Sequence, residues 1–127
     1  MSKFRILVVE DNPLNLKLVR DILQLVGHDV LEARSGEEGC ELAFQCAPHL
    51  VLMDLQLPGM DGVEALRVLR SDERTATIPV IAVTAFAMKA DRDRVGRAGF
   101  DGYLAKPISI RDLPSQVTQF LPQPSDD

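Results

Sequence analysis

The sequence lacks the features typical of membrane-spanning, disulfide-rich and nucleic-acid-binding proteins. None of its apolar runs approaches the roughly 20 residues that cross a bilayer, and its start lacks the cleavage site of a signal peptide. It has only two cysteines, Cys40 and Cys46, whose spacing fits neither a metal site nor a disulfide framework. A net charge of −5 at pH 7 argues against nonspecific binding to nucleic acid. We therefore expect a cytoplasmic protein with no membrane or nucleic-acid partner.

The chain does contain enough apolar residues for one folded domain. Hydrophobic residues make up 46% of its 127 positions, which suits a globular protein of this size. Three apolar runs, at residues 4–9, 50–53 and 80–83, are nearly continuous and typical of strands buried on both faces of a parallel sheet. Residues 29–33 alternate apolar with polar side chains, which indicates an edge strand, and a short fifth run lies at 102–104.

A helical pattern follows the first apolar run. Asn12 is placed to cap a helix that has Pro13 at its first position, and Gly27 is placed to end that helix. Apolar residues then repeat at a spacing of four, with two neighbours that widen the stripe. We expect this stripe to be the buried face, and it consists of Leu14, Leu18, Ile22 and Val26 with Val19 and Leu23.

Further helical patterns follow each of the other runs. Ser35 begins a capping box, and Asp61 is placed to cap a third helix. A charged fourth helix is expected at about residues 87–98. A fifth carries Leu113, Val117, Phe120 and Leu121. It is expected to begin near residue 112, because Pro114 is tolerated only in its first turn.

The alternation of strand and helix, repeated five times, predicts an α/β fold. Such an order is typical of a doubly wound parallel sheet with helices on both faces. The sequence shows no linker and no internal repeat. We expect residues 1–122 to form one domain and residues 123–127 to form a disordered polar tail.

Polar residues stand where four of the predicted strands end. Glu10 and Asp11 follow the first run, Asp54 follows the third, Thr84 the fourth, and Lys106 lies two residues beyond the fifth. The carboxyl ends of parallel strands share one edge of a sheet, and open α/β sheets bind ligands there. Each residue alone has an ordinary explanation, such as a helix cap or a solvated charge, but the five together predict a site.

This combination of groups predicts phosphoryl transfer. Three carboxylates held close together repel one another, so a cation must offset them, and Mg²⁺ suits an all-oxygen site. Lys106 adds a fixed positive charge and Thr84 a hydroxyl donor. A metal ion, an ammonium and a hydroxyl around one carboxylate stabilise the charge on a transferring phosphoryl group. Asp54 is the expected nucleophile, because a carboxylate can form an acyl phosphate.

Four motifs resemble those of the bacterial response-regulator receiver family in order and in spacing: ILVVEDN, LVLMDLQLPGMDG, IPVIAVTAFA and GYLAKPI. The resemblance covers about residues 4–121, and it is closest to single-domain regulators of cell cycle and polarity and to receivers attached to hybrid kinases. It implies two-component signal transduction and a flavodoxin-like sheet of order 2-1-3-4-5. Whether the chain is a complete regulator or a fragment of a hybrid kinase or larger regulator stays open.

The resemblance also implies a phosphoacceptor and a metal site. Asp54 is expected to accept a phosphoryl group from a sensor histidine kinase or a histidine phosphotransfer protein. Mg²⁺ or Mn²⁺ would be held by Glu10, Asp11, Asp54 and the backbone carbonyl of Gln56. Glu10 departs from the aspartate that is commoner at the first acidic position, so its ligation is also compatible with an intervening water. Beyond self-catalysed phosphoryl transfer and autodephosphorylation, no enzyme activity is expected.

Other residues are assigned to switching by the same resemblance. Thr84 and Lys106 would contact the phosphoryl oxygens, and a cis peptide bond is expected before Pro107. Tyr103 resembles the switch aromatic, which in that family follows the threonine inward on phosphorylation, although an ordinary half-buried aromatic fits it as well. A downstream protein target is expected on the surface formed by the fourth helix, the fifth strand and the fifth helix. Phe86 and Met88 are further candidates for that surface.

Three other functions leave different marks on a sequence. A small phosphohydrolase that uses an aspartyl phosphate needs a second acid two residues after the nucleophile, where this chain has Gln56. A flavin or nucleotide binder needs a first loop rich in Gly, Ser or Thr, whereas EDNPLN is acidic. An unphosphorylated scaffold is expected to lose Asp54 or Lys106, and both are present.

Overall fold

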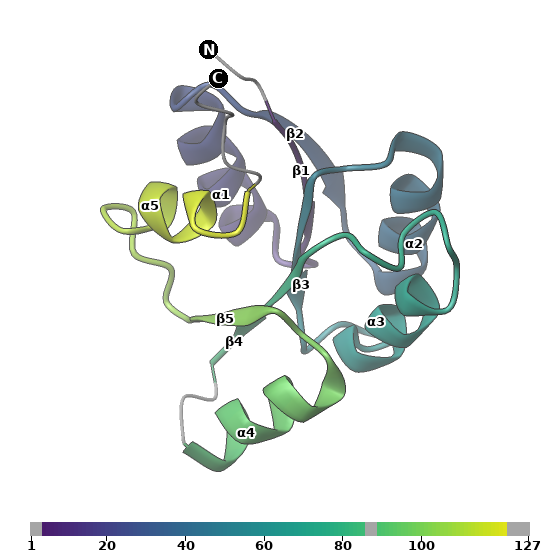
Figure 1. The fold of residues 1–127 in the computed structure, drawn as a ribbon. Helices are drawn as coiled ribbons and strands as arrows, with labels where there is room; N and C mark the ends of the chain where they lie inside the picture. The colour runs from purple at the N-terminus through teal and green to yellow at the C-terminus, as the bar shows by residue number, and fades with distance from the viewer. Residues whose placement is uncertain (1–3, 86–88, 122–127) are drawn as a thin grey trace, which may run out of the picture.

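A parallel β-sheet of five strands forms the centre of the molecule (Figure 1). The computed structural model describes residues 4–85 and 89–121, apart from the side chain of residue 91. The strands are β1 (Arg5–Val9), β2 (Asp29–Ala33), β3 (Leu50–Asp54), β4 (Val80–Thr84) and β5 (Gly102–Ala105). Their order in the sheet is β2-β1-β3-β4-β5, which confirms the predicted flavodoxin-like topology. The order reverses between β1 and β3, and this is the switch point where such sheets form their ligand sites.

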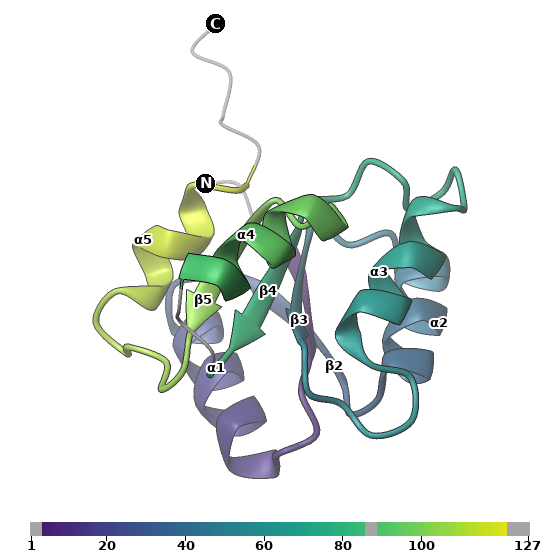
Figure 2. The same ribbon diagram turned by 90° about the horizontal axis from the view of Figure 1, so that it is seen from below.

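Five helices cover the two faces of the sheet among the described residues (Figures 1 and 2). On one face lie α1 (Pro13–Leu25) and α5 (Leu113–Thr118). On the other lie α2 (Gly36–Cys46), α3 (Gly62–Arg70) and α4 (Lys89–Ala98). In the part of the chain that the structure describes, no helix is both long enough and apolar enough to cross a membrane.

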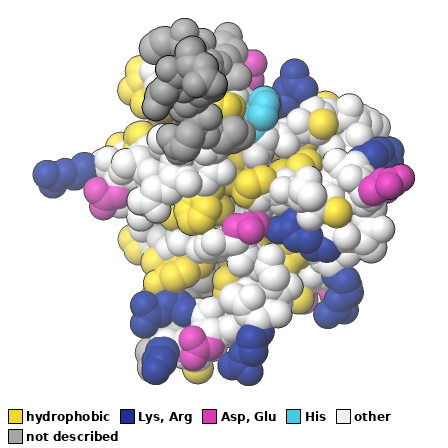
Figure 3. Space-filling model, in the orientation of Figure 1, with side chains coloured by type: hydrophobic (Ala, Val, Ile, Leu, Met, Phe, Trp, Pro, Cys, Tyr) yellow, Lys and Arg dark blue, Asp and Glu magenta, His cyan; other side chains and the backbone are white. Residues whose placement is uncertain are grey.

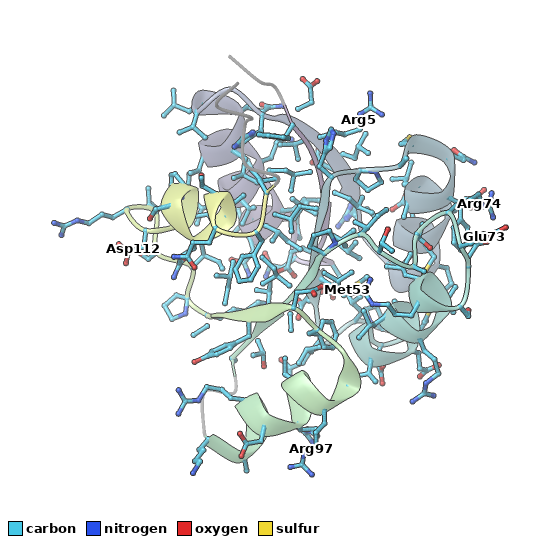
Figure 4. The ribbon with its side chains drawn as sticks, viewed as in Figure 1. Arg5, Met53, Glu73, Arg74, Arg97 and Asp112 are labelled. Carbon is cyan, nitrogen blue, oxygen red and sulfur yellow. The ribbon has the colours of Figure 1, made fainter. Side chains whose placement is uncertain are left out.

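The core therefore has two halves, one on each side of the sheet. Along β1, Ile6 and Val8 pack with α1 and α5, whereas Leu7 and Val9 pack with α2 and α3. Burial of alternate residues on both faces explains why the central strands are continuously apolar. Met53 of β3 lies at the centre of the sheet, whereas the charged side chains labelled with it lie at the periphery (Figure 4).

The predicted helix boundaries are largely confirmed. Asn12, Ser35 and Asp61 each accept a backbone N–H in the first turn of the helix that follows. Gly27 has a φ of 98°, and this left-handed conformation ends α1 at little cost only for a residue without a Cβ. The structure describes α4 from Lys89 on, so the expected start near residue 87 falls outside the described residues.

The last helix begins at Leu113, and Pro114 lies in its first turn as predicted. It is shorter than predicted, however, because it ends at Thr118 and leaves Phe120 and Leu121 in the segment that follows. Leu121 is still buried against the same half of the core. Apolar spacing alone did not separate a helix from a buried turn here.

The predicted buried stripe of α1 is partly wrong. The buried residues are Leu16, Val19, Ile22 and Leu23, whereas Leu14 is 77% exposed and Val26 is 45% exposed. A spacing of four residues advances about 40° beyond one full turn at each step, so a long series drifts around the helix. Spacings that alternate between three and four stay on one face, and Leu16, Val19 and Leu23 follow that rule.

Two leucines of α1 test this assignment of the buried face. Leu23 is fully buried and Leu25 is 86% exposed. Leu23→Ala should lower the free energy of unfolding by about 2–5 kcal/mol, because it leaves a cavity in the core. Leu25→Ala, the matched control, should change it by less than about 0.5 kcal/mol. Urea unfolding followed by circular dichroism measures both, and equal effects would show that the helix is rotated relative to this structure.

Candidate functional site

Three carboxylates meet at the carboxyl edge of the sheet. Glu10 and Asp11 directly follow β1, and Asp54 is the last residue of β3. The two strands are paired, with Val9 opposite Met53, so their ends lie side by side. One oxygen from each carboxylate lies within 4.8 Å of the other two. This all-oxygen donor set fits a hard divalent cation such as Mg²⁺.

The Asp54 carboxylate is buried and held in a fixed orientation. The residue is only 2% exposed. Its Oδ1 accepts the backbone N–H of Gln56 at 2.9 Å, and its Oδ2 accepts the Lys106 ammonium at 2.8 Å. The turn after β3 thus directs the backbone of Gln56 toward the acidic cluster.

Lys106 directly follows the edge strand β5 and reaches the carboxylates from there. Its Nζ lies 3.1 Å from Glu10 Oε1 as well as 2.8 Å from Asp54 Oδ2. Its backbone N–H donates to the Thr84 carbonyl at 2.8 Å, which holds the segment against the end of β4. The peptide bond to Pro107 is cis. Burial lowers the pKa of Lys106, but the hydrogen bonds to Asp54 and Glu10 outweigh this and raise it above the usual value, so the side chain is cationic.

Burial and repulsion within the cluster act together on the pKa of Glu10. It is 5% exposed, and its Oε2 accepts the backbone N–H of Asn12 at 3.1 Å. Burial raises the pKa of Glu10 to about 6, and the neighbouring Asp54 adds to the increase, while Asn12 and Lys106 lower it less. Without a bound cation, Glu10 therefore takes up a proton more readily than an ordinary glutamate does.

Thr84 and Tyr103 lie on the two neighbouring strands beyond β3, Thr84 on β4 and Tyr103 on the edge strand β5. Thr84 ends β4 and is 1% exposed. Tyr103 pairs with Ala82, and both belong to the half of the core that faces α3 and α4. Alternate residues of a strand share a face, so Thr84 points to the same side of the sheet as Ala82 and Tyr103. The predicted Phe86 and Met88 fall outside the described residues.

Two residues contribute to the site in ways that the sequence analysis missed. A Cβ on Gly62 would lie 2.6 Å from the Asp54 carbonyl oxygen and 2.9 Å from the Leu55 Cα, so glycine lets α3 start close to the end of β3. Its place directly after the Asp61 cap was the available signal. Asn12 was assigned as a helix cap, but its backbone N–H also orients the Glu10 carboxylate.

A family model described as the response regulator receiver domain matches residues 6–118. The chain belongs to this family. It is therefore a receiver domain of the two-component response regulators. Among curated relatives, the polar-differentiation response regulator DivK of Brucella ovis is 44% identical over 116 residues, which cover 91% of this chain and 94% of that protein.

Solved receiver structures agree with the fold. The chemotaxis response regulator CheY4 of Vibrio cholerae superposes with a TM-score of 0.89 over 94% of this receiver and all of that chain, at 22% identity. The receiver domain of the sensor histidine kinase PA1611 from Pseudomonas aeruginosa is 34% identical, with a TM-score of 0.85 over 94% of this chain and 98% of that one. That structure holds a magnesium ion coordinated in its active-site cleft.

The pKa of Glu10 predicts how the stability of the metal-free receiver depends on pH. The pKa of Glu10 is about 6 in the folded protein, against an ordinary value of 4.5. The protonated side chain therefore favours the folded state, and this contribution to stability is fully present below pH 4.5 and is lost as the pH rises through about 6. At about pH 7.5 without divalent ions, Glu10→Gln should therefore be more stable than wild type by about 1–2 kcal/mol.

Urea unfolding at two pH values measures this effect. At about pH 5 the difference between Glu10→Gln and wild type should shrink, because both then carry a largely neutral side chain. Glu73→Gln is a matched control on the exposed loop after α3 and should behave like wild type. A Glu10→Gln variant less stable than wild type at neutral pH would contradict the raised pKa of this buried acid.

Proposed function

We propose that this receiver is a phosphoryl-operated switch in which Asp54 accepts a phosphoryl group from the histidine of a sensor kinase or a histidine phosphotransfer protein. One observation carries the proposal. Asp54 is buried, and its Oδ2 lies 2.8 Å from the Lys106 ammonium. One of its carboxylate oxygens also lies within 4.8 Å of an oxygen from each of two more carboxylates. A nucleophilic carboxylate surrounded by groups that neutralise charge is what phosphoryl transfer requires.

In the proposed step, an oxygen of the Asp54 carboxylate forms a bond to phosphorus. The bond from phosphorus to the donor nitrogen breaks, and its electron pair stays on the donor histidine, which is then reprotonated. Lys106 and the Thr84 hydroxyl would contact the phosphoryl oxygens and stabilise their charge. Transfer would be catalysed by the receiver itself, and hydrolysis of the acyl phosphate would reset it.

The carboxylate cluster suits the metal that the PA1611 receiver holds. Mg²⁺ or Mn²⁺ would be held by Glu10, Asp11, Asp54 and the Gln56 carbonyl, and it would neutralise charge on the transferring phosphoryl oxygens. The charge balance supports this assignment, because the Lys106 ammonium contacts Glu10 and Asp54 while the cluster holds three carboxylates.

The proposed output is a protein contact. Phosphorylation would change the surface formed by α4, β5 and α5, with Tyr103 as the switch residue, and a downstream protein would bind there. The Brucella relatives are polar-differentiation response regulators, which suggests polar differentiation as the process that this switch controls. We propose that the switch acts in the cytoplasm, because its two cysteines are free. We also assign residues 1–122 to the receiver domain and residues 123–127 to a polar tail.

Acceptance of phosphate by Asp54 is tested by intact mass after incubation with acetyl phosphate. We expect a gain of one phosphoryl group that requires Mg²⁺ and is absent in Asp54→Asn, because the amide is not a nucleophile. Asp93→Asn, on the exposed surface of α4, is the matched control and should gain the group as wild type does. Persistent phosphorylation of Asp54→Asn would refute the assignment of the acceptor.

The metal assignment is tested by titration calorimetry. Wild type should bind Mg²⁺ weakly, and Asp11→Ala should abolish the binding because it removes a carboxylate of the cluster. Asp93→Asn should retain the wild-type affinity, which controls for the loss of one negative charge. An unchanged affinity in Asp11→Ala would remove this residue from the ligand set.

A further inference from the structure

A cation from α4 contacts the proposed switch residue. Arg92 Nη1 donates to the Tyr103 hydroxyl oxygen at 3.3 Å. The centre of the Arg92 guanidinium also lies 6.0 Å from the centroid of the Tyr103 ring, within the range of a cation–π interaction. Arg92 is exposed and Tyr103 is half-buried, so the contact holds the hydroxyl end of the ring toward the surface of α4.

Helix α4 is otherwise weakly attached to the domain. Of its side chains that the structure describes, only Val95 is buried, at 6% exposed. Basic groups gather on the surface over α4 at the lower end of the molecule (Figure 3). A helix with so little buried surface depends on individual contacts at its edges for its position.

The C-terminal end of α4 has an anchor of its own. Arg70 Nη2 donates to the Gly99 carbonyl at 3.4 Å and to Asp101 Oδ2 at 2.8 Å. Arg92 lies further back along the helix, on the side of β5. The contact between Arg92 and Tyr103 therefore ties the body of α4 to the edge strand, separately from the Arg70 anchor.

We propose that Arg92 is a positioning residue that holds the Tyr103 ring where it lies in this structure, here called the outward position, with its hydroxyl against α4, while Asp54 is unphosphorylated. Tyr103 lies on the same face as Thr84, two positions away in the strand register. Inward movement of the ring toward Thr84 requires the Arg92 contact to break, so Arg92 opposes the active conformation. The proposal rests on the proposed function, because it assumes that phosphorylation draws Tyr103 inward.

The expected size of the effect is modest. An exposed cation–π contact shifts a conformational equilibrium by about two- to fivefold. Loss of Arg92 should therefore lower the ratio of outward to inward Tyr103 by about that factor, while leaving the chemistry at Asp54 unchanged. A switch of this kind responds to a small bias, because two packed arrangements compete.

The sequence offers a direct probe of this contact. Tyr103 is the only tyrosine and the chain has no tryptophan, so tyrosine fluorescence and tyrosine ring NMR signals report on this one residue. The variants are Arg92→Ala, Arg92→Lys, which keeps the charge, and Arg97→Ala. Arg97 also lies on α4 and projects away from the sheet, so it serves as the matched control (Figure 4).

In the resting protein, the ring signals of Arg92→Ala should move toward those of phosphorylated wild type. Arg92→Lys should restore part of the shift, and Arg97→Ala should stay at the resting position. Intact mass on the same samples should show that every variant still gains one phosphoryl group, because none of the substitutions touches Asp54. The proposal is overturned if Arg92→Ala keeps the resting wild-type signals, or if Arg97→Ala moves as far.

The same samples separate this inference from the proposed function. If wild type takes up no phosphoryl group, the proposed function fails. The role of Arg92 is then decided in the resting protein by acrylamide quenching of Tyr103 fluorescence. A decrease in quenching with Arg92→Ala, but not with Arg97→Ala, supports the positioning role, and an unchanged or increased quenching with Arg92→Ala overturns it.

Discussion

The hydrogen bonds from the Lys106 ammonium to Asp54 and Glu10 are the interaction on which the rest of the site depends. Both carboxylates are almost fully buried, and buried charges of one sign are tolerated only where an opposite charge is close. One lysine offsets part of the charge of three acids, and the raised pKa of Glu10 is the remaining imbalance. The metal-free site therefore keeps an excess of negative charge that a divalent cation would offset.

The topology of the sheet makes this arrangement possible. The acids come from the ends of β1 and β3, and the lysine comes from the segment after β5, 52 residues beyond Asp54 in the sequence. The central strands β1, β3 and β4 are buried on both faces, which fixes the depth of their ends relative to one another. Thr84 lies at the end of the strand between Asp54 and Lys106, and Tyr103 lies on the strand beyond it. A change at Asp54 thus has a short structural route to the surface of α4.

The sequence was sufficient to predict the five strands and the edge at which the polar groups meet, because continuous apolar runs and the residues that end them are local signals. The order of the strands came instead from the resemblance to the receiver family. The sequence was not sufficient for features that depend on packing. The buried face of α1 includes Leu16, which lay outside the series with a spacing of four. The close approach at Gly62 depends on how α3 meets β3, and the Arg92 contact depends on where α4 lies. None of these follows from spacing along one element.

The most direct test of the account is to locate the phosphoryl group chemically. Borohydride reduces an acyl phosphate of aspartate to homoserine, so peptide mapping after treatment with acetyl phosphate, Mg²⁺ and borohydride identifies the acceptor residue. The account predicts homoserine at position 54 alone, and none when Mg²⁺ is withheld. Homoserine at position 11 or at another aspartate, with residue 54 unchanged, would contradict the central claim that Lys106 and the acidic cluster serve Asp54 as the acceptor.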